Sequence, residues 1–147
     1  MQQGMLLEST LAGRPWANLE QIVVDGTLPQ FAAGPVRAAW LALAARHDAL
    51  RMRLVPDARG GVAQQVLPEP DLVLAEQDLS DLLPEGQTAA LQAFLAQDRL
   101  TGVDVQARPG WRISLLRLSP SRAVMVWTIH HALIDGTQAR VGARAQG

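Results

Sequence analysis

The stretch that most constrains this chain is the apolar run at 123–129, which leads directly into two adjacent histidines. The run reads Ala-Val-Met-Val-Trp-Thr-Ile and follows a Ser-Pro-Ser turn signal. A short apolar segment rich in β-branched and aromatic residues, preceded by turn residues, is typical of a buried strand. His130, His131, Asp135 and Gly136 follow it. Functional groups gather where a rigid element gives way to a loop, so we expect the chemistry of the chain here.

The two histidines are expected to differ in their surroundings. Side chains alternate across a strand, so His130 and His131 point to opposite sides if the extended conformation continues. His131 would then share a side with Trp127, and His130 would share a side with Thr128. At most one imidazole therefore faces a given cavity, and we predict that the other is bonded to backbone.

Composition limits the class of protein. A chain of 147 residues with 48% hydrophobic and 18% charged residues suits one folded domain with a core. The formal net charge of -1 gives no basic signature, which disfavours nucleic acid as a partner. Cysteine is absent, which excludes disulfides and thiol catalysis. Without an apolar run of transmembrane length or a signal-peptide pattern, we expect a cytoplasmic protein with no membrane partner.

The remaining pattern predicts a mixture of helices and strands. Helices are expected at 3–11, 35–50 and 88–98, and strands at 19–24, 52–55, 62–67, 72–75, 111–118 and 123–130. Turns are expected at 25–26, 57–61 and 119–122, and a loop rich in Gly and Pro at 102–110. The elements do not alternate as βαβ units, which favours an α+β fold with a mixed or antiparallel sheet covered by helices.

The helix expected at 35–50 is amphipathic, and Pro35 suits its first position. Five residues at spacings of three and four form its predicted apolar stripe: Val36, Trp40, Leu43, His47 and Leu50. We expect His47 to be a half-buried packing residue on this stripe. Arg46 and Arg51 lie off it.

Three motifs follow one another in a recognisable order. Residues 1–6 read MQQGML, residues 46–51 read RHDALR, and residues 130–136 read HHALIDG. They resemble the opening segment, the RHxxLR motif and the HHxxxDG motif of the condensation domains of non-ribosomal peptide synthetases. The HHxxxDG motif is shared with the wider group of chloramphenicol acetyltransferase-like acyltransferases.

The resemblance implies a chloramphenicol acetyltransferase-like half domain. Residues 1–147 would be the N-terminal, donor-side half of a condensation domain, truncated after the HHxxxDG motif. The implied reaction is amide formation between an amine and a thioester carried on the phosphopantetheine of a carrier protein, with no bound cofactor or metal. A histidine with a pKa near 6.5 can accept a proton or orient the amine at neutral pH. By resemblance, His131 has this catalytic role.

The other motif residues would support the site. By resemblance, Asp135 pairs with an arginine that holds the loop, with Arg46 as the first candidate and Arg51 as the second. His130 is expected to be structural. Gly136, which has no side chain, would let the backbone come close to a pantetheine arm.

Partners and alternatives follow from the same reasoning. The implied partners are carrier proteins and the missing C-terminal half, without which we expect the chain to be inactive. One alternative is a non-catalytic remnant that binds a carrier protein. Another is a small stand-alone acyltransferase with its site between subunits. A metal site formed by His130, His131 and Asp135 is disfavoured because His47 is the sole remaining histidine in the sequence.

Overall fold

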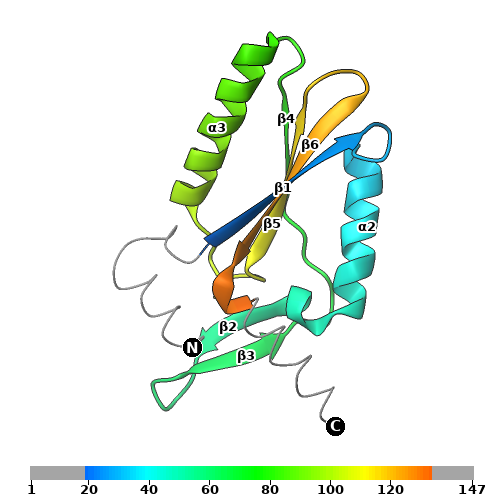
Figure 1. The fold of residues 1–147 in the computed structure, drawn as a ribbon. Coiled ribbons are helices and arrows are strands. Elements are labelled where there is room, and N and C mark those ends of the chain that lie inside the picture. Colours follow the sequence, from blue (N-terminus) through cyan, green and yellow to red (C-terminus); the bar gives the residue numbers. More distant parts are fainter. Residues whose placement is uncertain (1–18, 134–147) are drawn as a thin grey trace, which may run out of the picture.

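The computed structural model describes residues 19–133, and a four-stranded sheet lies at its centre (Figure 1). Its strands, in spatial order, are β1 (Leu19–Thr27), β6 (Arg122–His130), β5 (Trp111–Arg117) and β4 (Leu74–Asp78). Strand β6 pairs antiparallel with both β1 and β5, whereas β4 runs parallel to β5. The strand that carries the histidines is therefore held by hydrogen bonds on both sides.

A helix covers each face of this sheet (Figure 1). Helix α3 (Pro84–Thr101) packs on the face of β6 that carries Val126. Helix α2 (Ala33–Arg46) packs on the opposite face, which carries Trp127. This arrangement of a mixed sheet between helices confirms the predicted α+β fold, and it shows that the side chains of β6 alternate as expected.

A two-stranded sheet lies beyond the histidine end of the main sheet (Figure 1). It consists of β2 (Met52–Pro56) and β3 (Val62–Val66), and a short 3-10 helix, η1 (Asp48–Arg51), precedes it. The hairpin and its turn confirm the sequence prediction. The backbone N–H of Leu54 donates to the carbonyl of Val105 over 2.8 Å, which ties the hairpin to the loop before β5.

Several other elements are where the pattern predicted them. Strands β5 and β6 form the expected antiparallel pair, and β4 is an edge strand of the sheet that the structure describes, shifted two to three residues along the chain from the prediction. Helix α3 is longer than expected and packs through the predicted face: Leu91, Phe94 and Leu95. The helix expected at 3–11 lies outside the described residues.

The turn predicted at Asp25 and Gly26 is wrong, because β1 continues to Thr27. Gly26 pairs with Ala123 of β6 instead of leaving the sheet. A Cβ built on Gly26 would lie 2.3 Å from the ring of Phe31. The glycine therefore provides space for an aromatic ring within a strand, a role that is invisible in the local pattern.

The predicted stripe of α2 is also partly wrong. The helix ends at Arg46, and His47 is its C-cap residue. Val36 and Trp40 face the core, but the next buried position is Ala44, while Leu43 is 39% exposed. His47 is exposed and not half-buried. Since the helix stops one residue before His47, the spacing that placed this residue on the stripe no longer applies.

The outer edge of β1 exposes apolar side chains. Ile22, Val23 and Val24 are 38%, 44% and 38% exposed, respectively. Such an exposed edge, in the sheet formed by residues 19–133, is prone to association with other strands. None of the helices described between residues 19 and 133 has the length and apolar character needed to span a membrane.

Candidate active site at the end of strand β6

The backbone changes conformation between the two histidines. Strand β6 ends at His130, and residues 131–133 begin a helical turn. The backbone N–H of His130 still donates to the carbonyl of Gly110 over 2.9 Å. The alternation expected from the sequence therefore holds up to His130, but it does not extend to His131.

His130 is held inside the fold. The residue is 1% exposed, and its Nδ1 atom accepts a hydrogen bond from the backbone N–H of Ala132 over 3.0 Å. This bond requires that the proton of the neutral ring is on Nε2. Burial, and then the neighbouring His131, lower the pKa of His130 from 6.5 to about 4. His130 is consequently neutral near pH 7.

This lowered pKa predicts a pH-dependent stability. Between pH 6.5 and pH 4 the unfolded chain binds more protons at His130 than the folded chain does. The stability that comes from keeping His130 neutral is therefore fully present above pH 6.5 and is lost as the pH falls toward 4. We expect a loss of about 2 kcal/mol in the free energy of unfolding between about pH 7 and pH 5. Urea unfolding of the wild type and of His130→Gln measures this difference, and equal pH dependence in the two proteins would contradict the assignment.

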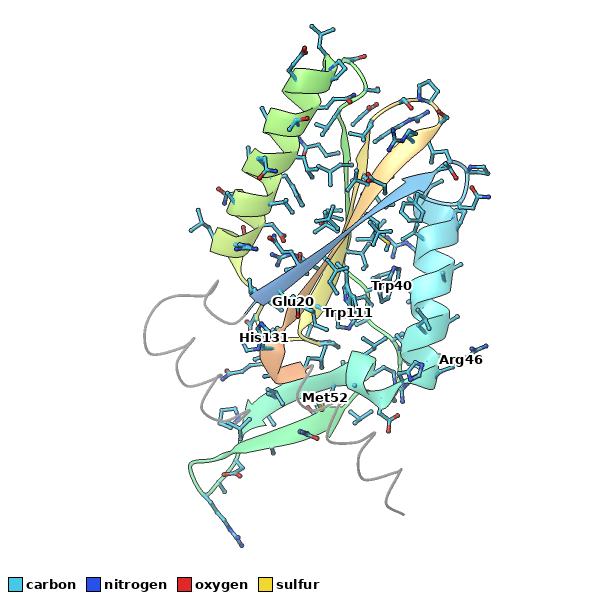
Figure 2. The ribbon with its side chains drawn as sticks, in the orientation of Figure 1. Glu20, Trp40, Arg46, Met52, Trp111 and His131 are labelled. Atoms are coloured by element: carbon cyan, nitrogen blue, oxygen red, sulfur yellow. The ribbon has the colours of Figure 1, made fainter. Side chains whose placement is uncertain are left out.

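His131 lies in a more open position. The residue is partly exposed, and it directly follows the last residue of β6. Figure 2 shows His131 at the same end of the sheet as Glu20, an exposed residue of β1 that pairs with Ile129. The two adjacent histidines thus have different surroundings, since His130 is enclosed in the fold and His131 is partly exposed.

Gly110 provides space for the side chain of Val105 beside His130. A Cβ at this position would lie 2.9 Å from Cγ1 of Val105 and 3.4 Å from Cβ of His130. We predict that Gly110→Ala lowers the free energy of unfolding by about 1–3 kcal/mol because the core becomes overpacked. Gly34→Ala is the matched control, since nothing lies within 4 Å of the new Cβ. That helical substitution should raise stability by up to about 1 kcal/mol. Urea unfolding followed by circular dichroism measures the free energy of unfolding of both variants. Equal changes in the two would show that the fold does not need the space at Gly110.

The two arginines of the second motif differ. Arg46 is exposed, and Figure 2 shows its side chain pointing away from the sheet. Arg51 is 14% exposed at its side chain and forms an ion pair with Asp48 over 2.8 Å. It also donates to the carbonyl of Leu67 over 3.0 Å and to two carbonyls at the end of α2. Arg51 therefore joins α2, η1 and the end of the hairpin.

Asp135 and Gly136 lie outside the described residues. The ion pair between Asp135 and Arg46 or Arg51 consequently stays a prediction. Among residues 19–133 no group of three or more His, Asp or Glu side chains is placed to hold a metal ion.

A buried polar cluster that the sequence analysis did not identify lies on the face of β6 that carries His130. Asp98 of α3 is 7% exposed. Its Oδ1 accepts a hydrogen bond from Nε of Arg112 over 2.8 Å and forms an ion pair with Nη2 of the same side chain over 2.7 Å. Its Oδ2 accepts hydrogen bonds from Thr128 and, over 2.8 Å, from Gln21. A signal was available, because Asp98 follows Phe94 at helical spacing, and a carboxylate on a buried face needs partners.

A hollow of about 360 Å³ lies elsewhere in the molecule. Its lining includes Phe31, Glu76, Arg117 and Ala123. Ala123 is near the start of β6, whereas the histidines are at the end of that strand. This hollow is therefore separate from the histidine site.

Comparison with known proteins decides the family. The model of the condensation domain matches residues 1–142. The chain belongs to the condensation domain family. Condensation domain structures also share its fold. The first condensation domain of the calcium-dependent antibiotic synthetase matches with a TM-score of 0.72 at 20% identity, over 88% of this chain and 33% of that one. A four-domain nonribosomal peptide synthetase, holo-AB3403, matches with a TM-score of 0.75 at 20% identity, over 90% of this chain and 10% of that one.

Similar sequences occur in much larger proteins. The chain is 33% identical over 140 residues to a linear gramicidin synthase of Brevibacillus parabrevis, a match that covers 92% of this chain and 3% of that protein. It is 35% identical over 144 residues to a cyclosporin synthetase of Tolypocladium inflatum, a match that covers 90% of this chain and 1% of that protein. This condensation domain sequence thus spans about a third of a solved condensation domain and a few per cent of these synthases.

Proposed function

We propose that this chain forms the donor-side part of a condensation site that joins a carrier-bound acyl or peptidyl group to an amine. The product is an amide, and His131 is the catalytic residue. The chain is inactive alone, because it spans about a third of a solved condensation domain. It works with the remainder of such a domain and with carrier proteins, in the cytoplasm.

The observation that carries this proposal is the different environment of the two histidines. His130 is 1% exposed and neutral, with Nδ1 bonded to the backbone. His131 is partly exposed at the end of a central strand. A reacting group requires access to the reactant, and the partial exposure of His131 supports this role better than the burial of His130 does. Membership of the condensation domain family supports the same assignment.

The proposed reaction is a single acyl transfer. The nitrogen of a neutral amine attacks the thioester carbonyl, so that a C–N bond forms and the C–S bond breaks. The amine loses a proton, and the departing pantetheine sulfur gains one. His131 accepts the amine proton or orients the amine through a hydrogen bond, and either role needs a neutral imidazole. Donors to the carbonyl oxygen would stabilise the negative charge that develops there.

The remaining motif residues have supporting roles in this proposal. Asp135 is held by an arginine, Arg46 or Arg51, and keeps the loop after β6 in place. Gly136 allows the pantetheine arm to pass close to the backbone. His130 supports the site from inside the fold.

The test is reconstitution of amide formation. The chain is mixed with a separately produced remainder of a condensation domain, a carrier loaded with an acyl thioester, and a carrier loaded with an aminoacyl thioester. Mass spectrometry then measures the amide on the acceptor carrier. We expect product when both parts of the domain are present and none with either part alone.

Two other results would replace this proposal. Binding of the loaded donor carrier without product, in an assembly that native mass spectrometry shows to be formed, would indicate a non-catalytic carrier-binding remnant. Product from the chain alone, together with a trimeric native mass, would indicate an acyltransferase whose site forms between subunits.

A further inference from the structure

Asp98 lies three residues before the end of α3, and its side chain is buried. Removal of a carboxylate from water is costly unless its oxygens are bonded and its charge is paired. Here Arg112 supplies the charge, and Gln21 and Thr128 supply further donors. These three partners belong to β5, β1 and β6, respectively. One side chain of α3 therefore binds three adjacent strands.

The three partners form one row across the sheet. In the register of the strands, Thr128 of β6 pairs with Gln21 on one side and with Arg112 on the other. His130 is two residues further along β6 and lies on the same face. Its neighbours are Leu19 of β1, by register, and Gly110, which accepts its backbone N–H. The row bound to Asp98 therefore lies directly beside the row that contains His130.

The same network also determines where the covering loop begins. Nη2 of Arg112 donates to the carbonyl of Asp98 over 2.7 Å, and Nη1 donates to the carbonyl of Gly102. Gly102 ends α3 with a φ of 72°, a conformation that suits glycine. The loop from Gly102 ends at Gly110, which packs against His130. Both the strand below His130 and the loop beside it are thus attached to this carboxylate and its arginine.

From these contacts we infer that Asp98, acting with Arg112 and Thr128, is a positioning residue for the pair His130 and His131. The network holds the last residues of β6 and the loop at 102–110 in one arrangement. That arrangement keeps Nδ1 of His130 on the N–H of Ala132, and it thereby determines where His131 leaves the strand. The inference rests on the proposed function only in taking His131 as the reacting group.

The first test needs no activity. In the full chain, Asp98→Asn is compared with Phe94→Leu, which changes packing on the same helix face and leaves the carboxylate intact. Native-state hydrogen exchange of the Ala132 amide and the ¹⁵N spectrum of the His130 ring are recorded where both variants are folded. We expect Asp98→Asn to reduce protection of the Ala132 amide by about tenfold or more and to disturb the single Nε2–H tautomer.

The control and the milder variant make the result decisive. Phe94→Leu should lower protection only in proportion to its loss of global stability. Thr128→Val removes one hydroxyl donor with little change of shape, and it should cause a smaller effect in the same direction if Asp98→Asn does not fold. The inference would be overturned if Asp98→Asn and Phe94→Leu reduced protection of the Ala132 amide equally at matched stability. It would also be overturned if Thr128→Val left that protection and the His130 tautomer unchanged.

The second test uses the reconstituted assembly. Because a small misplacement of a reacting group has a large effect on rate, Asp98→Asn should lower kcat by about tenfold or more and change KM by less than about threefold. Full kcat in a folded Asp98→Asn assembly would overturn the inference. The wild-type assembly could form no amide while Asp98→Asn still reduces protection of the Ala132 amide and disturbs the His130 tautomer. In that case the proposed function fails, and the positioning of the histidine pair is supported.

Discussion

Replacement of His131 by alanine is expected to lower kcat for amide formation by about 10²–10⁴-fold in the reconstituted assembly. Within residues 19–133, the imidazole of His131 follows the end of β6, is partly exposed and lies next in the chain to the buried ring of His130. Its removal leaves the attacking amine without a proton acceptor or an orienting partner. The amide on the acceptor carrier is measured by mass spectrometry at saturating concentrations of both loaded carriers.

Folding must remain intact for this result to be informative. His131 is not part of the buried core, so His131→Ala should change the free energy of unfolding by less than about 1 kcal/mol. His47→Ala is the matched control, because it removes an exposed imidazole at the end of α2. It should retain activity within about threefold of the wild type. A loss of less than about tenfold in His131→Ala, equivalent to ~1.4 kcal/mol, would contradict a catalytic role.

The largest loss of stability is expected for Trp111→Ala. Trp111 is 3% exposed, and its ring centroid lies 5.3 Å from that of Trp40 of α2. Its Nε1 donates to the carbonyl of Leu50 over 2.9 Å, which attaches β5 to η1. Truncation would create a cavity and leave that carbonyl unpaired, so the free energy of unfolding should fall by about 3–5 kcal/mol. This is a large share of the total of about 5–15 kcal/mol for a typical domain.

Two milder tryptophan variants separate the hydrogen bond from the packing. Trp111→Phe keeps an aromatic ring but loses the bond to Leu50, and it should cost about 1–2 kcal/mol. Trp127→Phe removes an Nε1 that is buried without a hydrogen-bond partner among the described residues. It should therefore cost less than Trp111→Phe. Urea unfolding followed by circular dichroism measures the free energy of unfolding of all three variants. A larger loss for Trp127→Phe than for Trp111→Phe would show that packing, and not the hydrogen bond to Leu50, determines the cost of these substitutions.

Local patterns predicted the elements whose partners are near in the chain. The pair β5 and β6 and the hairpin of β2 and β3 were correctly predicted, since each needs a short turn and two apolar runs. The parallel pairing of β4 with β5 was not predicted, because those strands are separated by the whole of α3. The predicted stripe of α2 was wrong at Leu43, where Ala44 is buried instead, and at His47, because the helix ends at Arg46.

Some residues of the candidate site were likewise predictable from the sequence, whereas others depend on distant partners. By resemblance, the HHxxxDG motif predicted His130, His131 and Asp135 as site residues and proton transfer or positioning as the role of His131, and this assignment stays a prediction. The sequence alone did not indicate that Asp98 and Gly110 support the site. Their importance depends on which strand, loop or helix lies opposite them.

The amino-acid sequence alone determined that a buried strand leads into two adjacent histidines and that helices and strands build an α+β fold, because apolar periodicity and turn residues act over short distances. The family resemblance implied a structural role for His130, but only the tertiary structure shows that His130 is enclosed and that His131 is partly exposed. That difference arises from contacts of His130 with Gly110 and of Asp98 with three strands, and such contacts join residues far apart in the chain.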